Sequence, residues 1–227
     1  MKKYVSILLM IFCVVGVSHA KDTLKIGCIA PLTGDVKTFG ESAKNGFTIA
    51  LEEYAVKGKY NITPVIADDK NDPTEGTNAA LKLITQDKVI AITGVTVSSC
   101  GIAASAVAED NKIPFVAAAA VNPKVTVDER TGKVKNYTFR ACFIDSFQGI
   151  VGVNFAFNSL KAKKVAIMVD NSSDYSKGLT RIFRDAFVAK GGNIVSEEAY
   201  LQKDQDYKSI LTKIKAQNPD LLYIPGY

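Results

Sequence analysis

The chain has 227 residues, of which 47% are hydrophobic and 22% are charged, and its formal net charge is +5. This composition is typical of a globular protein. Trp is absent and the only His is His19, which argues against histidine-based acid–base catalysis and against a histidine metal site. The basic residues are scattered and do not alternate with aromatic residues in a stripe, so no nucleic-acid partner is expected.

The first twenty residues have the pattern of a secretory signal peptide. Lys2 and Lys3 precede an almost unbroken apolar run at residues 5–17, and Ser18 and Ala20 are small residues suited to a cleavage site. An uncleaved N-terminal anchor is the alternative, but the apolar run is shorter than the roughly twenty residues that a membrane span needs. We therefore predict a cleaved signal peptide at residues 1–20, an exported (periplasmic or extracytoplasmic) protein, and no membrane span after cleavage.

Cleavage at this point leaves three cysteines in the mature chain: Cys28, Cys100 and Cys142. An odd number in an exported protein leaves at least one of them unpaired. No C-x-x-C motif is present, so the sequence supports neither a redox pair nor a zinc site. Cys28 lies in an apolar segment and is predicted to be a core residue.

From Thr23 onward, strand-like and helical segments alternate. Strands are expected at residues 23–32, 61–69, 89–94 and 113–120. Apolar residues at helical spacing predict helices at residues 39–56, 72–87 and 98–110. Asp72 is a candidate N-cap, with Pro73 in the first turn of its helix. A polar linker at residues 122–137 ends this first series.

A second series follows the linker. Extended segments are expected at residues 138–144, 163–171, 193–201 and 219–227, and helices at residues 145–160, 172–192 and 205–217. Asp145 is a candidate N-cap, and Gly191 with Gly192 ends the long second helix. Strands that alternate with helices indicate βαβ units and parallel sheets. We predict an α/β fold with two doubly wound parallel-sheet lobes that meet near residues 140–145.

Two serines, Ser98 and Ser99, stand where a strand ends and a helix begins. One interpretation is helix capping, because a serine oxygen accepts a hydrogen bond from a free backbone N–H. The other is anion binding, because the free N–H groups and the helix dipole attract a carboxylate or phosphate. Ligands of open α/β sheets bind outside the carboxyl ends of the strands, which is where these serines are expected. Phosphate binding has less support, since the chain lacks a P-loop and a G-x-G-x-x-G motif.

The ordered loops resemble those of the periplasmic branched-chain amino acid binding proteins, the leucine/isoleucine/valine type of ABC-transporter substrate-binding protein. The segments that carry the resemblance are "IGCIAPLTGDVKTFGESAKNGFTIALEE", "DDKNDP", "GVTVSSCG", "NPKVT", "FRACFIDSFQG", "DNSSDYSKGL" and "DLLYIPGY". The resemblance implies a type I periplasmic binding protein fold, with two α/β lobes that close on a ligand about a hinge. It places the lobes at residues 21–141 and 142–227.

The resemblance also implies a set of ligand contacts on the first lobe. Ser98, with Ser99 beside it, matches the serine that holds the ligand carboxylate through its N–H and hydroxyl groups. Ala119, Ala120 and Val121 match the loop in which a carbonyl accepts from the ligand ammonium and a following Thr adds its N–H and hydroxyl. Val121 departs from the Thr pattern, which puts the usual grip on an α-amino acid in doubt. For Ala119, close backbone packing at a strand end is the alternative.

Three aromatic residues complete the predicted site. Phe39 matches an aromatic at the mouth of the cleft, and Tyr175 and Tyr227 match aromatics that the second lobe brings onto the ligand. Packing in the core or on the surface is the alternative for each tyrosine. Proteins of this family are longer and bring an acidic residue that pairs with the ligand ammonium, for which no counterpart is found. We therefore expect both lobes to be incomplete at their C-terminal ends, with exposed sheet edges and poor binding.

Three classes of function are weighed. The first is an extracytoplasmic receptor that delivers a small amino acid-like ligand to the membrane permease of an ABC transporter. The second is a ligand-sensing domain of the same fold that binds an amide or another small carboxylate. The third, an enzyme with Ser98 as nucleophile, is disfavoured because the mature chain has no histidine to serve as a base. No cofactor and no metal ion are expected, and Asp68, Asp69 and Asp72 are interpreted as turn and cap residues.

Overall fold

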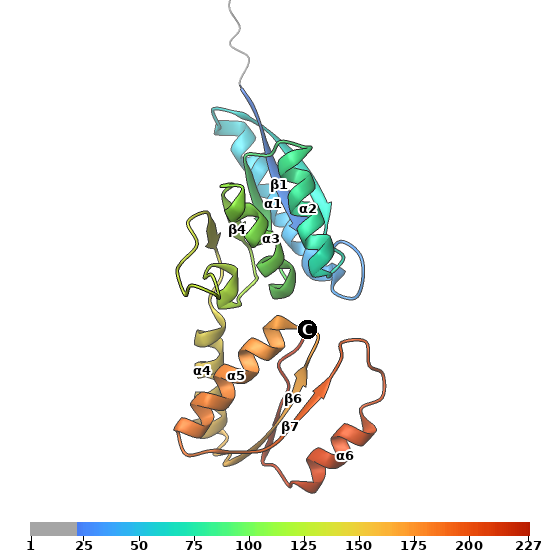
Figure 1. The fold of residues 1–227 in the computed structure, drawn as a ribbon, viewed down its shortest axis with the longest axis vertical. Helices are drawn as coiled ribbons and strands as arrows, with labels where there is room; N and C mark the ends of the chain where they lie inside the picture. Colours follow the sequence, from blue (N-terminus) through green and yellow to red (C-terminus); the bar gives the residue numbers. More distant parts are fainter. Residues whose placement is uncertain (1–21) are drawn as a thin grey trace, which may run out of the picture.

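The computed structural model describes residues 22–227, so the predicted signal peptide lies outside the described residues. The chain forms two α/β units, one after the other in sequence, and Figure 1 shows one above the other. The C-terminal residue lies where the two units meet. We refer to residues 22–141 as lobe one and to residues 142–227 as lobe two. Within the described part of the chain, the helices are too short or too polar to cross a membrane.

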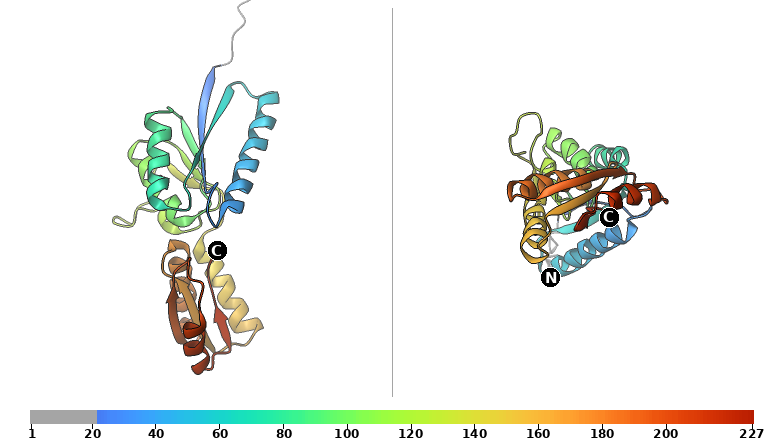
Figure 2. Two further views of the ribbon diagram at one scale, coloured as in Figure 1. Left: turned by 90° about the vertical axis from the view of Figure 1, so that its right-hand side faces the viewer. Right: turned by 90° about the horizontal axis from the view of Figure 1, so that it is seen from below.

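Lobe one contains a five-stranded sheet in the order β2-β1-β3-β4-β5. Its strands are β1 (Thr23–Ala30), β2 (Asn61–Asp68), β3 (Ala91–Gly94), β4 (Phe115–Ala117) and β5 (Thr138–Arg140). Its helices are α1 (Lys37–Lys57), α2 (Pro73–Thr85), α3 (Ser98–Asp110) and the short 3-10 helix η1 (Pro123–Val125). All strand pairings are parallel, and Figure 2 shows α1 on one face of the sheet with α2 and α3 on the other.

Lobe two contains a three-stranded parallel sheet in the order β7-β6-β8. Its strands are β6 (Lys164–Asp170), β7 (Asn193–Tyr200) and β8 (Leu221–Tyr223). Its helices are α4 (Asp145–Asn154), which continues into the π-helical turn η2 (Phe155–Ser159), α5 (Asp174–Ala189) and α6 (Lys208–Ala216). The predicted α/β class with parallel sheets is confirmed in both lobes.

Side chains of β6 alternate between two cores. Val165 and Ile167 are fully buried and pack with Phe183 of α5, whereas Ala166 and Met168 face α6 on the other side. This alternation is the period-two geometry of a strand whose two faces are both covered. Lobe two is therefore a sheet between two helical layers, as a doubly wound lobe requires.

The core of lobe one lies between the sheet and the pair α2 and α3. Ile29, Leu83, Ile92 and Phe115 are among its fully or almost fully buried members. The opposite face carries α1, in which Gly40 is the buried residue. Cys28 is fully buried, which confirms its prediction as a core residue.

The N-cap predicted from the sequence is confirmed for one helix and is wrong for two. Asp72 caps α2 as predicted, accepting from the backbone N–H groups of Thr74 and Glu75. The prediction that Asp145 caps α4 is wrong, because Ile144 is the N-cap and Asp145 is the first helical residue. The capping interpretation of Ser98 fails in the same way, because Val97 occupies the N-cap of α3 and makes no side-chain cap bond. Neither serine therefore caps its own helix, α3.

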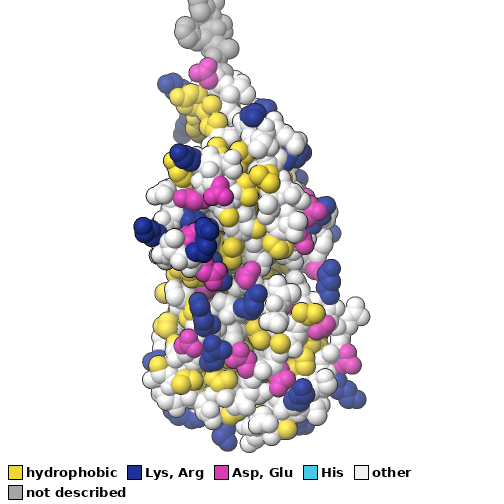
Figure 3. Space-filling model, in the orientation of Figure 1, with side chains coloured by type: hydrophobic (Ala, Val, Ile, Leu, Met, Phe, Trp, Pro, Cys, Tyr) yellow, Lys and Arg dark blue, Asp and Glu magenta, His cyan; other side chains and the backbone are white. Residues whose placement is uncertain are grey.

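On the face of the molecule seen in Figure 3, lysines and arginines are interspersed with acidic residues over both lobes. The ion pairs of the described residues are short-range surface pairs such as Lys70–Glu75, Lys177–Asp174 and Arg184–Glu197. Pairs of this kind contribute about 0–1 kcal/mol each. The stability of the fold therefore rests on the buried cores of the two lobes.

Candidate functional site

The turn after β3 sets the position of both serines. Gly94 has φ +98°, and a Cβ there would lie 2.2 Å from the carbonyl oxygen of Ile29. Val95 follows with φ +45°, a left-handed conformation that is costly for a β-branched side chain. The turn directs the chain into α3, so that Ser98 and Ser99 form the first turn of that helix at the junction of the lobes.

Both serines make hydrogen bonds with groups at this junction. The backbone N–H of Ser98 donates to the hydroxyl of Tyr227 at 3.3 Å, and the Ser98 Oγ accepts from the N–H of Asn122 at 3.3 Å. The Oγ of Ser99 accepts from the backbone N–H of Asp174 in lobe two at 3.1 Å. The two serines thus connect α3 to residues of the other lobe, in addition to the loop after β4.

The loop after β4 carries three of the predicted site residues. Ala119 and Val121 line a cavity between the lobes, whereas Ala120 is fully buried and its carbonyl accepts from Arg140 Nη1 at 3.3 Å. The carbonyl of Val121 accepts from the backbone N–H of Asp145 at 3.1 Å. This loop is therefore tied to the start of α4, where the chain enters lobe two.

The three predicted aromatic residues lie together. The ring of Tyr227 stacks on Tyr175 with 5.1 Å between the centroids and meets Phe39 edge-on at 6.2 Å. Tyr175 is held in turn by Gln148, whose Nε2 donates to the tyrosine hydroxyl at 2.8 Å. Burial raises the pKa of the Tyr175 hydroxyl, which therefore stays protonated at neutral pH. Aromatic side chains from both lobes form one cluster across the junction.

These elements enclose a cavity of about 300 Å³ with equal numbers of lining residues from the two lobes. Lobe one contributes Phe39, Thr96, Val97, Ala119 and Val121, and lobe two contributes Phe143, Gln148, Tyr175, Gly226 and Tyr227. None of these ten side chains is charged. Their surfaces are mainly apolar with a few polar groups, which is the usual lining of a small-molecule site.

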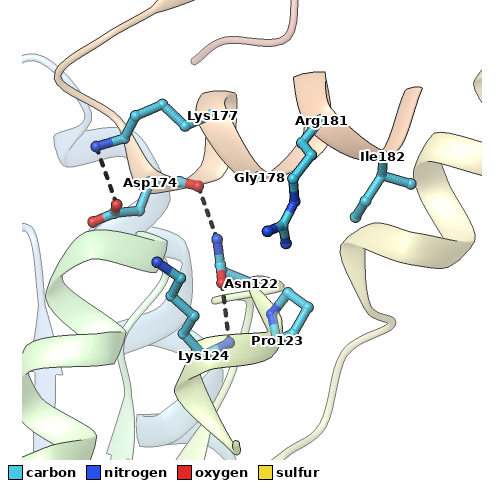
Figure 4. A pocket seen from close by; sticks show the side chains of 8 residues that line it. All are labelled: Asn122, Pro123, Lys124, Asp174, Lys177, Gly178, Arg181 and Ile182. Atoms are coloured by element: carbon cyan, nitrogen blue, oxygen red, sulfur yellow. Dashed lines mark hydrogen bonds and ion pairs between the residues drawn. The ribbon is translucent and has the colours of Figure 1, made fainter. Parts of the chain in front are cut away.

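A second cavity, of about 270 Å³, lies at the same junction and is shown in Figure 4. The Asn122 Nδ2 donates across it to the carbonyl of Asp174 at 2.8 Å, and the Asn122 Oδ1 accepts from the N–H of Lys124. Lys177 pairs with Asp174 at 3.2 Å, and the Arg181 guanidinium points toward Pro123. Asn122 thus joins the loop after β4 to the start of α5.

Of the eight residues predicted from the sequence, five line the first cavity and three do not. The three that do not line it are Ser98, Ser99 and Ala120. The N–H of Ser98 instead donates to the hydroxyl of Tyr227. Sequence reasoning missed five lining residues: Thr96, Val97, Phe143, Gln148 and Gly226. All five stand within three residues of a predicted site or cap residue, so the sequence indicated these regions of the chain without identifying the individual side chains.

The arrangement is suited to binding and offers little for catalysis. Ser98 Oγ accepts from a backbone N–H, and within residues 22–227 no base bonds to it. No group of three or more His, Cys, Asp or Glu that could hold a metal ion occurs in the same residues. Asp68 and Asp69 accept from turn N–H groups, as the sequence predicts for turn residues.

The sequence pattern of the periplasmic binding protein family matches residues 23–226. A relative from Rhizobium johnstonii, described as the Leu/Ile/Val-binding protein BraC3, is 32% identical over 92% of this chain and 56% of its own length. An amino acid binding protein from Pseudomonas aeruginosa is 34% identical over 96% of this chain and 58% of its own length. The chain thus spans somewhat more than half the length of the curated relatives it matches.

Solved structures agree with this assignment. The leucine binding protein LivK from Thermotoga maritima has a TM-score of 0.84 and 36% identity, covering 90% of this chain and 56% of its own. The substrate binding protein LivJ from Streptococcus pneumoniae, solved with isoleucine, has a TM-score of 0.80 and 32% identity (91% and 57%). A solute binding protein from Rhodopseudomonas palustris, solved with 3,4-dihydroxybenzoic acid, has a TM-score of 0.76 and 28% identity (90% and 54%). The chain belongs to the periplasmic binding protein family.

Proposed function

We propose that this protein is an extracytoplasmic receptor that clamps a small amino acid-like ligand between its two lobes. The observation that carries the proposal is the cavity of about 300 Å³, whose walls come equally from lobe one and lobe two. A ligand held there contacts both lobes at once and therefore favours the conformation in which they are close together. In this proposal residues 22–141 and 142–227 are the parts that move relative to each other.

The ligand carboxylate is assigned to the start of α3. Ser98 and Ser99 directly follow Val97, which lines the cavity, and Val121 lines it as well. A helix N-terminus attracts an anion through its free N–H groups. Charge-assisted hydrogen bonds of this kind contribute about 1.5–3 kcal/mol each. The carboxylate takes the place of the Tyr227 hydroxyl on the Ser98 N–H, while the carbonyl of Ala119 accepts from a ligand amine.

The ligand side chain is assigned to the apolar part of the cavity. Phe39 lies on the lobe-one side, and Tyr175 with Tyr227 covers it from lobe two. Val121 replaces a polar residue with an aliphatic one and enlarges this apolar surface. One methylene more or less in such a pocket changes the binding free energy by about 1–3 kcal/mol. Branched aliphatic amino acids are the ligands that this surface fits best.

The lobes also bond directly to each other, which gives the closed arrangement its own stability. Ser99 and Asn122 of lobe one bond to the N–H and the carbonyl of Asp174, and Asn71 Nδ2 donates to Gln202 Oε1 at 3.1 Å. A ligand adds to these bonds and shifts the population further toward closure. In our proposal, the partner that recognises the closed conformation is the permease of an ABC transporter in the membrane facing the periplasm.

Thermal unfolding of the purified full-length mature protein, screened against the twenty amino acids and a set of carboxylates and amides, tests the proposal. A ligand that binds only the folded state adds about 2.7 kcal/mol of stability at a hundredfold its Kd. We expect the melting temperature to rise with leucine, isoleucine or valine. A Ser99→Ala variant is expected to weaken this response, whereas Ser42→Ala, on exposed α1, leaves it unchanged. No shift with any compound of the screen would contradict the proposal.

A further inference from the structure

Asp145 is a buried carboxylate that the proposed binding mechanism does not use. Its exposed fraction is 0%, and neither of its carboxylate oxygens has a hydrogen-bond partner among the described residues. Buried carboxylates are normally paired or hydrogen-bonded, because an isolated buried charge is costly. An unpartnered one at the junction of two lobes therefore requires an explanation.

The surroundings of Asp145 come from both lobes. Its backbone N–H donates to the carbonyl of Val121, and its Oδ2 faces Gly178 of α5, where a Cβ would lie 3.2 Å from that oxygen and 2.7 Å from Asn122 Nδ2. Arg140 of β5 is the nearby cation, but its guanidinium donates to carbonyl groups and to a threonine, and it forms no ion pair with Asp145 within residues 22–227. The other titratable groups that interact with Asp145 are Cys142, Tyr175, Tyr223 and Tyr227.

The Asp145 carboxylate lies beside Asn122 and Gly178, which line the second cavity together with the charged residues Asp174, Lys177 and Arg181. Its connection to the first cavity runs through its backbone and its charge. Val121, whose carbonyl holds the Asp145 N–H, lines that cavity, and so does Gln148, one turn further along the same face of α4. Tyr175 lines it as well and senses the charge of Asp145. Because no charged side chain lines the cavity, and because charges interact strongly in a region of low dielectric constant, Asp145 acts on a ligand without touching it.

We propose that Asp145 selects ligands by charge, favouring a ligand that carries a cationic group beside its carboxylate over an anion that lacks one. The inference rests on the proposed function and adds a specificity residue to it. The ligand carboxylate is held at the start of α3, and the field of Asp145 acts on the remainder of the ligand. An α-amino acid brings a compensating ammonium group, whereas a simple carboxylate adds a second negative charge near the first.

Titration of Asp145 gives the selection a pH signature. Burial raises the pKa of Asp145 to about 7, although Arg140 lowers it in part. A ligand ammonium lowers this pKa further, so affinity for an amino acid is full above pH 7 and is lost as the pH falls. An anion without an amine raises the pKa, so its affinity is full below pH 7 and is lost as the pH rises. The two ligand classes therefore have pH dependences of opposite sign.

The first experiment compares each amino acid with its analogue that lacks the amine: leucine with isocaproate, valine with isovalerate, and phenylalanine with hydrocinnamate. Calorimetric titration of the wild-type protein between about pH 6 and about pH 8 measures both affinities. We expect affinity for the amino acid to rise, and affinity for the analogue to fall, by up to about tenfold. Slopes of the same sign for both ligand classes would overturn the inference, and this test needs no variant.

The second experiment uses Asp145→Asn, which keeps the shape of the side chain and removes its charge. We expect the preference for leucine over isocaproate to fall by about tenfold, and the part of each pH slope due to Asp145 to disappear. Asp185→Asn, an exposed carboxylate on α5, is the matched control and keeps the wild-type preference and slopes. Unchanged preference and slopes in Asp145→Asn would overturn the inference while leaving the proposed function intact.

Asp69 is a second buried carboxylate, and burial raises its pKa to about 6. The comparison of variants separates its contribution to the pH slope from that of Asp145. Asp69 interacts with Cys100 of α3, and we expect it to contribute the same slope in the wild type and in both variants. A wild-type protein that binds neither ligand class would overturn the proposed function itself, and with it this inference. The two failures are therefore distinct.

Discussion

The two sides of the first cavity differ in how far their side chains are exposed. On the lobe-one side, Thr96, Val97 and Val121, in the loops after β3 and β4, expose 9% or less of their surface, whereas Phe39 exposes 50%. On the lobe-two side, Phe143 exposes 55% and Tyr227 exposes 44%. The loop residues of lobe one are thus an extension of a core, whereas Phe39 and the exposed rings of lobe two have room to move.

This difference indicates a division of labour within one site. A carboxylate needs donors at fixed positions, because hydrogen bonds weaken steeply when their geometry is poor. An apolar side chain needs only contact, which exposed aromatic rings supply in many arrangements. Substitutions in the lobe-one loops should therefore change mainly the free energy of unfolding. Substitutions on the lobe-two side should change mainly the affinity for the ligand.

The largest effect is expected for Gly94→Ala. The added Cβ would meet the carbonyl oxygen of Ile29, in a backbone conformation that already disfavours any side chain, so we expect a loss of about 3–5 kcal/mol in the free energy of unfolding. Gly191→Ala is the control, since Gly191 also has a positive φ but nothing lies near its Cβ position. Its expected loss is about 1–2 kcal/mol. Urea unfolding measures both, and equal losses would show that the close approach to Ile29 is unimportant.

An intermediate effect is expected for Asn122→Ala. The variant loses the bond to the Asp174 carbonyl and the bond from the Lys124 N–H, for a total of about 1–3 kcal/mol. Because the first of these bonds joins the lobes, we also expect a larger radius of gyration by small-angle X-ray scattering. Asn111→Ala, which breaks a bond at the exposed end of α3, is the control and leaves the radius unchanged. An unaltered radius in Asn122→Ala would show that this bond does not hold the lobes together.

The smallest effect on stability is expected for Phe143→Ala. The ring is largely exposed, so its removal should change the free energy of unfolding by no more than about 0.5 kcal/mol. It lines the cavity, however, and we expect ligand affinity to fall by about tenfold as apolar contact is lost. Phe155→Ala, equally exposed but away from the cavity, should leave affinity unchanged. A strong loss of stability in Phe143→Ala would contradict the division of labour.

The sequence predicted the architecture because its signals are local. Strands and helices alternate with clear periodicity, and parallel sheets follow from that alternation. Asp72 was predicted correctly as a cap, since its pattern with Pro73 is complete within a few residues. The same local rule failed for Asp145, because the packing of α5 against α4 turns this side chain into a buried junction and away from the helix end.

The site was predicted less completely than the fold. Phe39, Tyr175 and Tyr227 lie together and line the cavity, but which lobe-two side chains fill the remaining wall depends on how the lobes approach each other. Gln148 and Phe143 reach the cavity through that approach, and no periodicity in the sequence encodes it. Whether Ser98 and Ser99 hold a carboxylate stays a prediction.

Within residues 22–227 the polypeptide crosses from lobe one to lobe two a single time, at residues 141–144 between β5 and α4. This short connection keeps the lobes at an effective concentration of the order of millimolar or higher. Bonds that would be far too few to hold two separate molecules together are then sufficient to bring the lobes into contact. In our proposal, a ligand at this junction therefore needs to add only a small free energy to favour the closed arrangement.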